Sequence, residues 1–185
     1  LGDGNVTAVY MSDDSGATVH CAGVVVTTGI NFPDDASANP SADVNTLDNY
    51  EEGTFTPAFS AATGTLGTIS YGNRVGKYTK IGDAVHITFS FYTSAFAVGD
   101  GSGIMSITGL PFTSMSGKNS ALSLGDIRLW GGDHPSEAKI GGGVTYVSLF
   151  YRDAVDGANT GILVADATTG TATAQILEVS GTYFV

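Results

Sequence analysis

The sequence is poor in charged residues, in cysteine and in helix-forming clusters. Charged residues make up 14% of its 185 positions, against about 25% in an ordinary globular domain. Leu, Lys, Glu and Arg never cluster, so no long amphipathic helix is available. Cys21 is the single cysteine, which excludes an intrachain disulfide and a cysteine-rich zinc site. The surface must therefore depend on Ser, Thr, Asn and Gly, and the fold on strands.

Cationic residues are also scarce, and this limits the classes of partner. Seven Lys and Arg stand against 18 Asp and Glu, which gives a formal net charge of −11 at pH 7. A chain of this charge repels phosphate groups, so we expect no nucleic-acid binding. No apolar run approaches the roughly 18 residues that a spanning helix needs, so we expect no membrane insertion.

Alternating apolar residues predict strands. The clearest strand covers residues 84–92, and the last one covers residues 177–185. In both, one set of alternating positions is mostly apolar, which predicts one face on a core and one polar face. These apolar positions are Val85, Ile87, Phe89 and Phe91 in the first strand, and Leu177, Val179, Tyr183 and Val185 in the second. Residues 143–152 are apolar on both faces, which predicts burial on both sides, by a second sheet and by another subunit.

Shorter strands are predicted at 54–59, 68–71, 77–81, 104–108, 121–124, 126–130 and 161–165. Turn signals separate them, at Gly72-Asn73, Gly82-Asp83, Asp100-Gly101 and Asp156-Gly157. Short strands at this spacing indicate an all-β, antiparallel β-sandwich or jelly-roll-like knob.

The amino-acid composition changes twice along the chain. Residues 1–30 hold short β-prone runs that cannot bury a core alone. Residues 31–50 are rich in Pro, Asp and Asn and indicate an extended linker. Residues 51–185 then form the predicted knob.

No residue pattern points to catalysis. His20, His86 and His134 are scattered, without the spacing of a catalytic zinc site, and no Gly-x-Ser-x-Gly elbow occurs. The carboxylates that a glycan-cleaving site would require could come only from Glu51, Glu52, Asp126 and Asp133. We therefore predict no enzyme, no cofactor and no metal.

A candidate recognition surface remains in residues 130–134, Trp-Gly-Gly-Asp-His. Trp130 is the only tryptophan, and Asp133 and His134 follow it. An exposed aromatic ring beside polar groups holds sugar rings by stacking and hydrogen bonding. The alternative is that Trp130 closes the end of the core. Tyr151 and Arg152 form a second candidate, although Arg152 could simply pair with Asp153 or a neighbouring chain.

Three segments occur in order along the chain. They are Leu47-Asp48-Asn49-Tyr50-Glu51-Glu52-Gly53-Thr54-Phe55-Thr56-Pro57, Gly76-Lys77-Tyr78-Thr79-Lys80-Ile81-Gly82 and Ile107-Thr108-Gly109-Leu110-Pro111-Phe112. Their combination resembles the C-terminal region of tail fibre proteins of tailed bacteriophages, particularly marine and environmental phages. The resemblance covers about residues 45–185. Beyond Phe112 it depends on the pattern of short strands and not on a motif.

The resemblance implies a homotrimeric fibre tip at the distal end of a virion tail fibre, with residues 1–30 as the end of the fibre shaft. It implies attachment to a bacterial surface polysaccharide, lipopolysaccharide or outer-membrane protein, and contact with other tail proteins. Two alternatives stay open. One is a structural virion or filament subunit without receptor binding, and the other is a polysaccharide-cleaving tailspike.

Overall fold

The computed structural model describes residues 49–152, 157–170 and 175–185, and these residues form an antiparallel β structure. The predictions for residues 1–30 and 31–48 lie outside the described residues. The strands are β1 (Glu51–Phe55), β2 (Ala58–Thr63), β3 (Ile69–Ile81), β4 (Ala84–Phe96), β5 (Ser102–Thr108), β6 (Ser120–Arg128), β7 (Glu137–Ile140), β8 (Tyr146–Arg152), β9 (Asn159–Gly161) and β10 (Ile176–Phe184). One 3-10 turn, η1 (Val164–Asp166), interrupts them. No described helix is long and apolar enough to cross a membrane.

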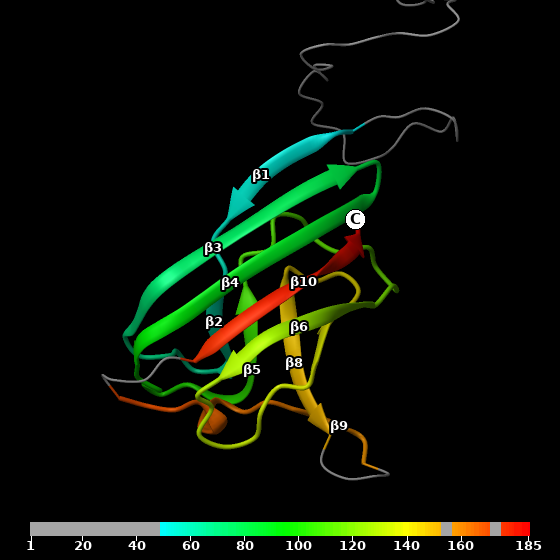
Figure 1. Ribbon diagram of the computed structural model, residues 1–185. Helices are drawn as coiled ribbons and strands as arrows, with labels where there is room; N and C mark the ends of the chain where they lie inside the picture. Colours follow the sequence, from blue (N-terminus) through cyan, green and yellow to red (C-terminus); the bar gives the residue numbers. More distant parts are fainter. Residues whose placement is uncertain (1–48, 153–156, 171–174) are drawn as a thin grey trace, which may run out of the picture. The chain divides into compact units, whose positions relative to one another are not determined.

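All strands belong to one sheet, in the order β1-β3-β4-β10-β6-β7-β8-β5-β2, with β9 paired to β8. Every pairing is antiparallel. The sheet curls into a half-barrel, so that β2, β5 and β8 lie behind the broad front formed by β3, β4 and β10 (Figure 1). The all-β prediction is confirmed, while the finer sandwich or jelly-roll prediction stays a prediction.

The core lies inside the curl, on the face that the alternating patterns predicted. Val85, Ile87, Phe89 and Phe91 of β4 are at most 3% exposed, as are Leu177, Val179 and Tyr183 of β10. Phe59 of β2 meets Phe91 of β4 edge to face, with ring centroids 4.7 Å apart. This contact joins strands near opposite ends of the sheet order and so holds the curl closed.

In the part of the chain that the structure describes, only one face of β8 is fully buried. Val147 and Leu149 are fully buried, whereas Tyr146 on the opposite face is 39% exposed. Among the described residues, nothing provides the predicted cover over this second face. Cover by another subunit stays a prediction.

The predicted turn at Gly72-Asn73 is wrong, because both residues lie inside β3. The ladder between β3 and β4 shifts register around Tyr71 and Asn73, so this stretch is a bulge within one long strand. A side chain at position 72 would collide with the ring of Tyr92, since an added Cβ would lie 1.9 Å from that ring. The glycine that signals a turn in the sequence thus makes room for a cross-strand aromatic ring. The predicted strands at 121–124 and 126–130 similarly join as β6.

The predicted strand at 54–59 is wrong in the opposite sense, because Thr56 and Pro57 break it into β1 and β2. Pro57 has no N–H to donate to a ladder. On either side of this break, β1 and β2 form the two opposite edges of the sheet. Two residues therefore connect both edges of the half-barrel.

The three segments of the phage-fibre resemblance contact one another. β1 pairs with the second segment from Glu51 opposite Lys80 to Phe55 opposite Gly76. Phe112 of the third segment lies edge to face with Tyr78, at 5.3 Å between ring centroids. The segments thus form one continuous packing unit.

Candidate binding surfaces

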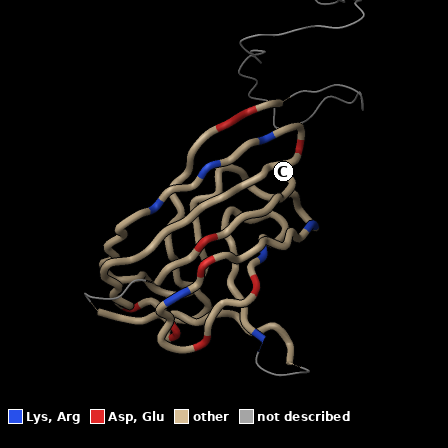
Figure 2. Tube along the Cα trace, viewed as in Figure 1, with Lys and Arg blue, Asp and Glu red and all other residues tan. Residues whose placement is uncertain are grey.

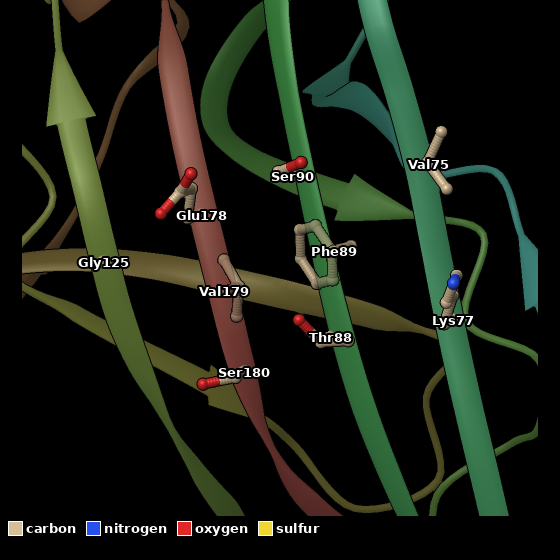
Figure 3. Close-up of a pocket in the computed structure, with 9 residues that line it drawn as sticks. All are labelled: Val75, Lys77, Thr88, Phe89, Ser90, Gly125, Glu178, Val179 and Ser180. Atoms are coloured by element: carbon tan, nitrogen blue, oxygen red, sulfur yellow. The ribbon is translucent and has the colours of Figure 1, made fainter.

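A shallow groove crosses the outward face of the sheet, over β3, β4, β10 and β6 (Figure 3). Its volume is about 410 Å³. Pockets for small ligands generally measure about 300–1,000 Å³, so the groove can hold a short ligand segment. It is lined by Val75, Lys77, Thr88, Phe89, Ser90, Gly125, Glu178, Val179 and Ser180.

Opposite charges border the groove. Lys77 of β3 is the register partner of Thr88 on β4, and Glu178 of β10 is the partner of Ser90 on β4. The two charged residues therefore stand on either side of β4. Both side chains are exposed, and neither forms a direct ion pair with any described residue, although Glu178 interacts electrostatically with Arg128 of β6. Each remains available to a ligand.

Gly125 helps to create the hollow. It lies on β6 where the ladder with β10 shifts register, between Leu177 and Val179. A Cβ at position 125 would lie 3.1 Å from both Cβ and Oε2 of Glu178, so the Glu178 side chain occupies the space beside this glycine. In Figure 3, Glu178 points toward β6 and away from Lys77. The strip above β4 between Lys77 and Glu178 is therefore left uncovered.

The floor of the groove is polar. Phe89 and Val179 turn into the core and are at most 3% exposed, so they present only backbone to the groove. Thr88, Ser90 and Ser180 point outward, and their hydroxyls have no hydrogen-bond partner among the described residues. A hydroxyl both donates and accepts, so the groove combines three such groups with one ammonium and one carboxylate.

Trp130 closes the core, as the alternative interpretation proposed. Its side chain is 6% exposed, and its ring meets Phe59 edge to face at 6.0 Å between centroids. Its indole Nε1 has no hydrogen-bond partner among the described residues. Leu129, immediately before it, has a positive φ of 65° and is 53% exposed. In this chain Trp130 therefore cannot act as an open platform for a sugar ring.

Asp133 and His134 are exposed, and Asp166 fixes the loop that carries them. The amide N–H groups of Gly131 and Gly132 donate to the backbone oxygen of Asp166, at 2.8 and 3.0 Å. The Asp166 carboxylate accepts the N–H of Asp133 at 3.3 Å. The loop is thus held by hydrogen bonds to η1.

Tyr151 and Arg152 lie at the end of β8. Arg152 forms an ion pair with Glu137 of β7, at 2.9 Å between Nη2 and Oε1. Asp153, one of the partners considered from the sequence, lies outside the described residues. Asn159 of β9 donates to the other oxygen of the same carboxylate. Tyr151 is half-buried against the core. This ion pair is exposed, which limits its contribution to stability to about 1 kcal/mol or less.

The structure brings both candidate groups to one end of the sheet, here called the distal end and made by residues 97–101, 129–136, 150–152 and 157–170. β7 begins shortly after His134 and runs antiparallel to β8, which ends at Arg152. Bridges from Phe96 to Gly170 and from Trp130 to Ala167 tie these loops together. Glu51 and the C-terminus lie at the opposite end (Figure 1).

The carboxylates considered for glycan cleavage are not brought together. Glu51 accepts a hydrogen bond from Tyr78 at the end opposite the distal loops, and Asp126 pairs with Arg128 on β6. Burial, and then the Glu51 carboxylate, raise the pKa of Tyr78 to about 12. Asp126 raises the pKa of the Arg128 guanidinium by hydrogen bonding and charge. Among the described residues, no group of three or more His, Cys, Asp or Glu could hold a metal ion.

Sequence reasoning missed the groove. The polar faces of β4 and β10 were predicted, and they include Thr88, Ser90, Glu178 and Ser180. What the sequence does not contain is the pairing of β10 with β4, which runs from Ile176 opposite Tyr92 to Phe184 opposite Ala84 although the two strands are far apart along the chain. The bulge at Gly125 carried no distinctive sequence signal.

Comparisons with protein-family models, with curated proteins and with solved structures find no match to this chain.

Proposed function

We propose that this chain is a non-enzymatic attachment module, the tip of a bacteriophage tail fibre, and that its distal end contacts a bacterial surface. The observation that carries the proposal is the position of the exposed candidate residues. Asp133, His134 and Arg152 gather at the distal end, whereas the chain connects covalently to residues 1–48 at Asn49, beside β1. Such a module can be tethered at one end and make contact at the other.

The composition of the distal end suits recognition of a surface ligand. Leu129 and Leu163 are 53% and 43% exposed, and the same end of the sheet also carries charged and amide groups such as Arg152 and Asn159. Apolar and polar groups on one end of the molecule suit both faces of a sugar ring or a protein loop. A surface polysaccharide, a lipopolysaccharide or an outer-membrane protein would serve as receptor.

In this proposal the half-barrel is the sandwich-like knob of a homotrimer. Three weak contacts on one rigid assembly strengthen attachment through effective concentration, without any new contact at each site. The exposed face of β8 is available for packing between copies. Light scattering on the intact chain should give the mass of a trimer, and a monomer mass would contradict this part of the proposal.

The test of attachment uses arrays of bacterial lipopolysaccharides and capsular polysaccharides, with fluorescently labelled protein. We expect the double variant His134→Ala, Arg152→Ala to lose at least about tenfold in binding to any glycan that the parent captures, because avidity multiplies the loss at each site. Lys118→Ala is the matched control, since Lys118 stacks on Phe184 of β10 at 3.6 Å, away from the distal loops. Equal capture by the double variant would refute the distal-end assignment. Release of new reducing ends from a captured glycan would refute the non-enzymatic one.

A further inference from the structure

The positive charges of this protein are concentrated in the β domain. All seven Lys and Arg lie between residues 74 and 152, whereas seven of the 18 Asp and Glu precede residue 49. β3 carries three of the cations, Arg74, Lys77 and Lys80 (Figure 2). The net charge of the whole chain therefore overstates the repulsion that an acidic ligand meets at this sheet.

Lys77 is the cation of β3 that faces the groove. Arg74 stacks on the ring of Tyr71, with its guanidinium carbon 4.4 Å from the ring centroid. Lys80 points inward, is 4% exposed and lies near the ring of Phe112. Lys77 has neither an aromatic nor an anionic partner among the described residues. Its ammonium group can therefore bind an anionic group on a ligand.

The separation of Lys77 and Glu178 fits a ligand longer than one chemical group. They stand on the two strands that flank β4, so their backbones are about two strand spacings apart, or roughly 10 Å. No direct ion pair joins the two among the described residues, and the hydroxyl-lined strip lies between them. A ligand that reaches both charges must also lie over Thr88, Ser90 and Ser180.

We propose that this groove binds an acidic oligosaccharide, with a sugar carboxylate on Lys77 and the hydroxyls of a neighbouring sugar on Glu178. A carboxylate accepts hydrogen bonds at two oxygens, which suits a pair of adjacent hydroxyls. The hydroxyls of Thr88, Ser90 and Ser180 donate to or accept from the sugar between these contacts. Exposed Val75, at 47%, gives the apolar face of a ring a surface to rest on.

Other ligand classes fit the groove less well. An apolar ligand would have to cover the charges and hydroxyls without pairing them, which is unfavourable. A nucleic acid requires several cations along its path, and the groove offers Lys77 alone. A neutral sugar would leave Lys77 without a counter-charge and should bind more weakly than its acidic counterpart.

This site is separate from the distal end and shares no residue with it. The inference therefore does not depend on the proposed attachment function. Either one can fail while the other holds.

The experiment titrates the intact protein with a β-1,4-linked mannuronate trisaccharide, and in parallel with neutral β-1,4-mannotriose, by ¹H–¹⁵N NMR. We expect saturable shifts of the amides of Thr88, Ser90 and Ser180 with a Kd of roughly 1 mM for the acidic sugar. Mannotriose should bind about fivefold more weakly, which is the effect of one exposed ion pair. Distal-loop amides should not shift.

Variants test the individual contacts. Lys77→Gln should weaken mannuronate binding about fivefold and abolish the preference over mannotriose. Glu178→Gln should weaken both sugars about tenfold or more, because hydrogen bonds to a charged group are stronger than those to an amide. Lys139→Gln removes a positive charge from β7, outside the groove, and should leave both affinities unchanged.

Three results would overturn the inference. The first is an absence of saturable shifts in the unchanged protein, and the second is saturable shifts that map to the distal loops alone. The third is equal loss of mannuronate affinity in Lys77→Gln and Lys139→Gln, which would show a general charge effect. Because the shift map uses the unchanged protein, it remains decisive if a variant fails to fold.

Discussion

Phe59 should be among the most sensitive positions in this protein, because it connects strands that the sheet order holds far apart. It is 6% exposed, and its ring contacts Phe91, Phe96 and Trp130 edge to face, at 4.7, 5.9 and 6.0 Å between centroids. Its backbone N–H also donates to the Tyr71 hydroxyl at 2.9 Å, which ties the free edge of β2 to β3. That backbone bond survives a side-chain substitution, so a substitution isolates the ring contacts.

We expect Phe59→Ala to lower the free energy of unfolding by about 4 kcal/mol, the middle of the range of about 3–5 kcal/mol for buried phenylalanine. Each edge-to-face contact contributes about 0.5–1.5 kcal/mol beyond burial, so the three contacts supply a large part of this loss. For a domain whose free energy of unfolding is about 5–15 kcal/mol, this loss is between roughly a quarter and four fifths of the total.

Equilibrium urea unfolding measures the change, followed both by the fluorescence of Trp130, the only tryptophan, and by circular dichroism. Phe59→Leu is the matched control. It keeps an apolar side chain and loses the aromatic geometry, so we expect a loss of about 1–1.5 kcal/mol. A loss below about 1 kcal/mol for Phe59→Ala would refute the argument that this contact holds the two ends of the sheet together.

Two further predictions concern single side chains. Burial raises the pKa of the Tyr183 phenol to about 12, and the phenol hydrogen-bonds the backbone of Phe112. In the unfolded chain the phenol of this tyrosine ionises near pH 10. The stability that it contributes should therefore be complete below pH 10 and fall as the pH rises toward 12. The midpoint of unfolding should fall less steeply across that interval in Tyr183→Phe than in the unchanged protein. Gly109 has φ +98°, and an added Cβ would lie 2.4 Å from the Thr56 oxygen. Gly109→Ala should therefore destabilise by more than about 2 kcal/mol, whereas Gly82→Ala, with positive φ and open space, should cost about 1–2 kcal/mol; equal midpoints in thermal unfolding would contradict this.

Local alternation predicted the inward faces of β4 and β10 correctly. The burial of every second side chain in a strand is a property of a few adjacent residues, so it can be seen in the sequence. Glycine and proline were less informative. Gly72 makes room for the ring of Tyr92 inside a strand, whereas Pro57 separates two strands that the apolar pattern had joined.

The binding surfaces required information that no local pattern holds. The groove exists because β10 pairs with β4 on one side and with β6 on the other, and because Gly125 leaves space for Glu178. The candidate Trp130 shows the same limit. Its neighbours Asp133 and His134 are exposed, as expected for a recognition loop, but the indole turns inward to Phe59. An aromatic residue beside glycines fits both situations equally well from sequence alone.

The position of β1 has a mechanical consequence. β1 joins the rest of the sheet through its ladder with β3, from Glu51 opposite Lys80 to Phe55 opposite Gly76. In an antiparallel ladder the hydrogen bonds lie perpendicular to the strands. A pulling force between Asn49 and the distal end runs along β1 and so loads all rungs of the ladder together in shear (Figure 1). They cannot be peeled open one at a time, so β1 resists tension as a unit.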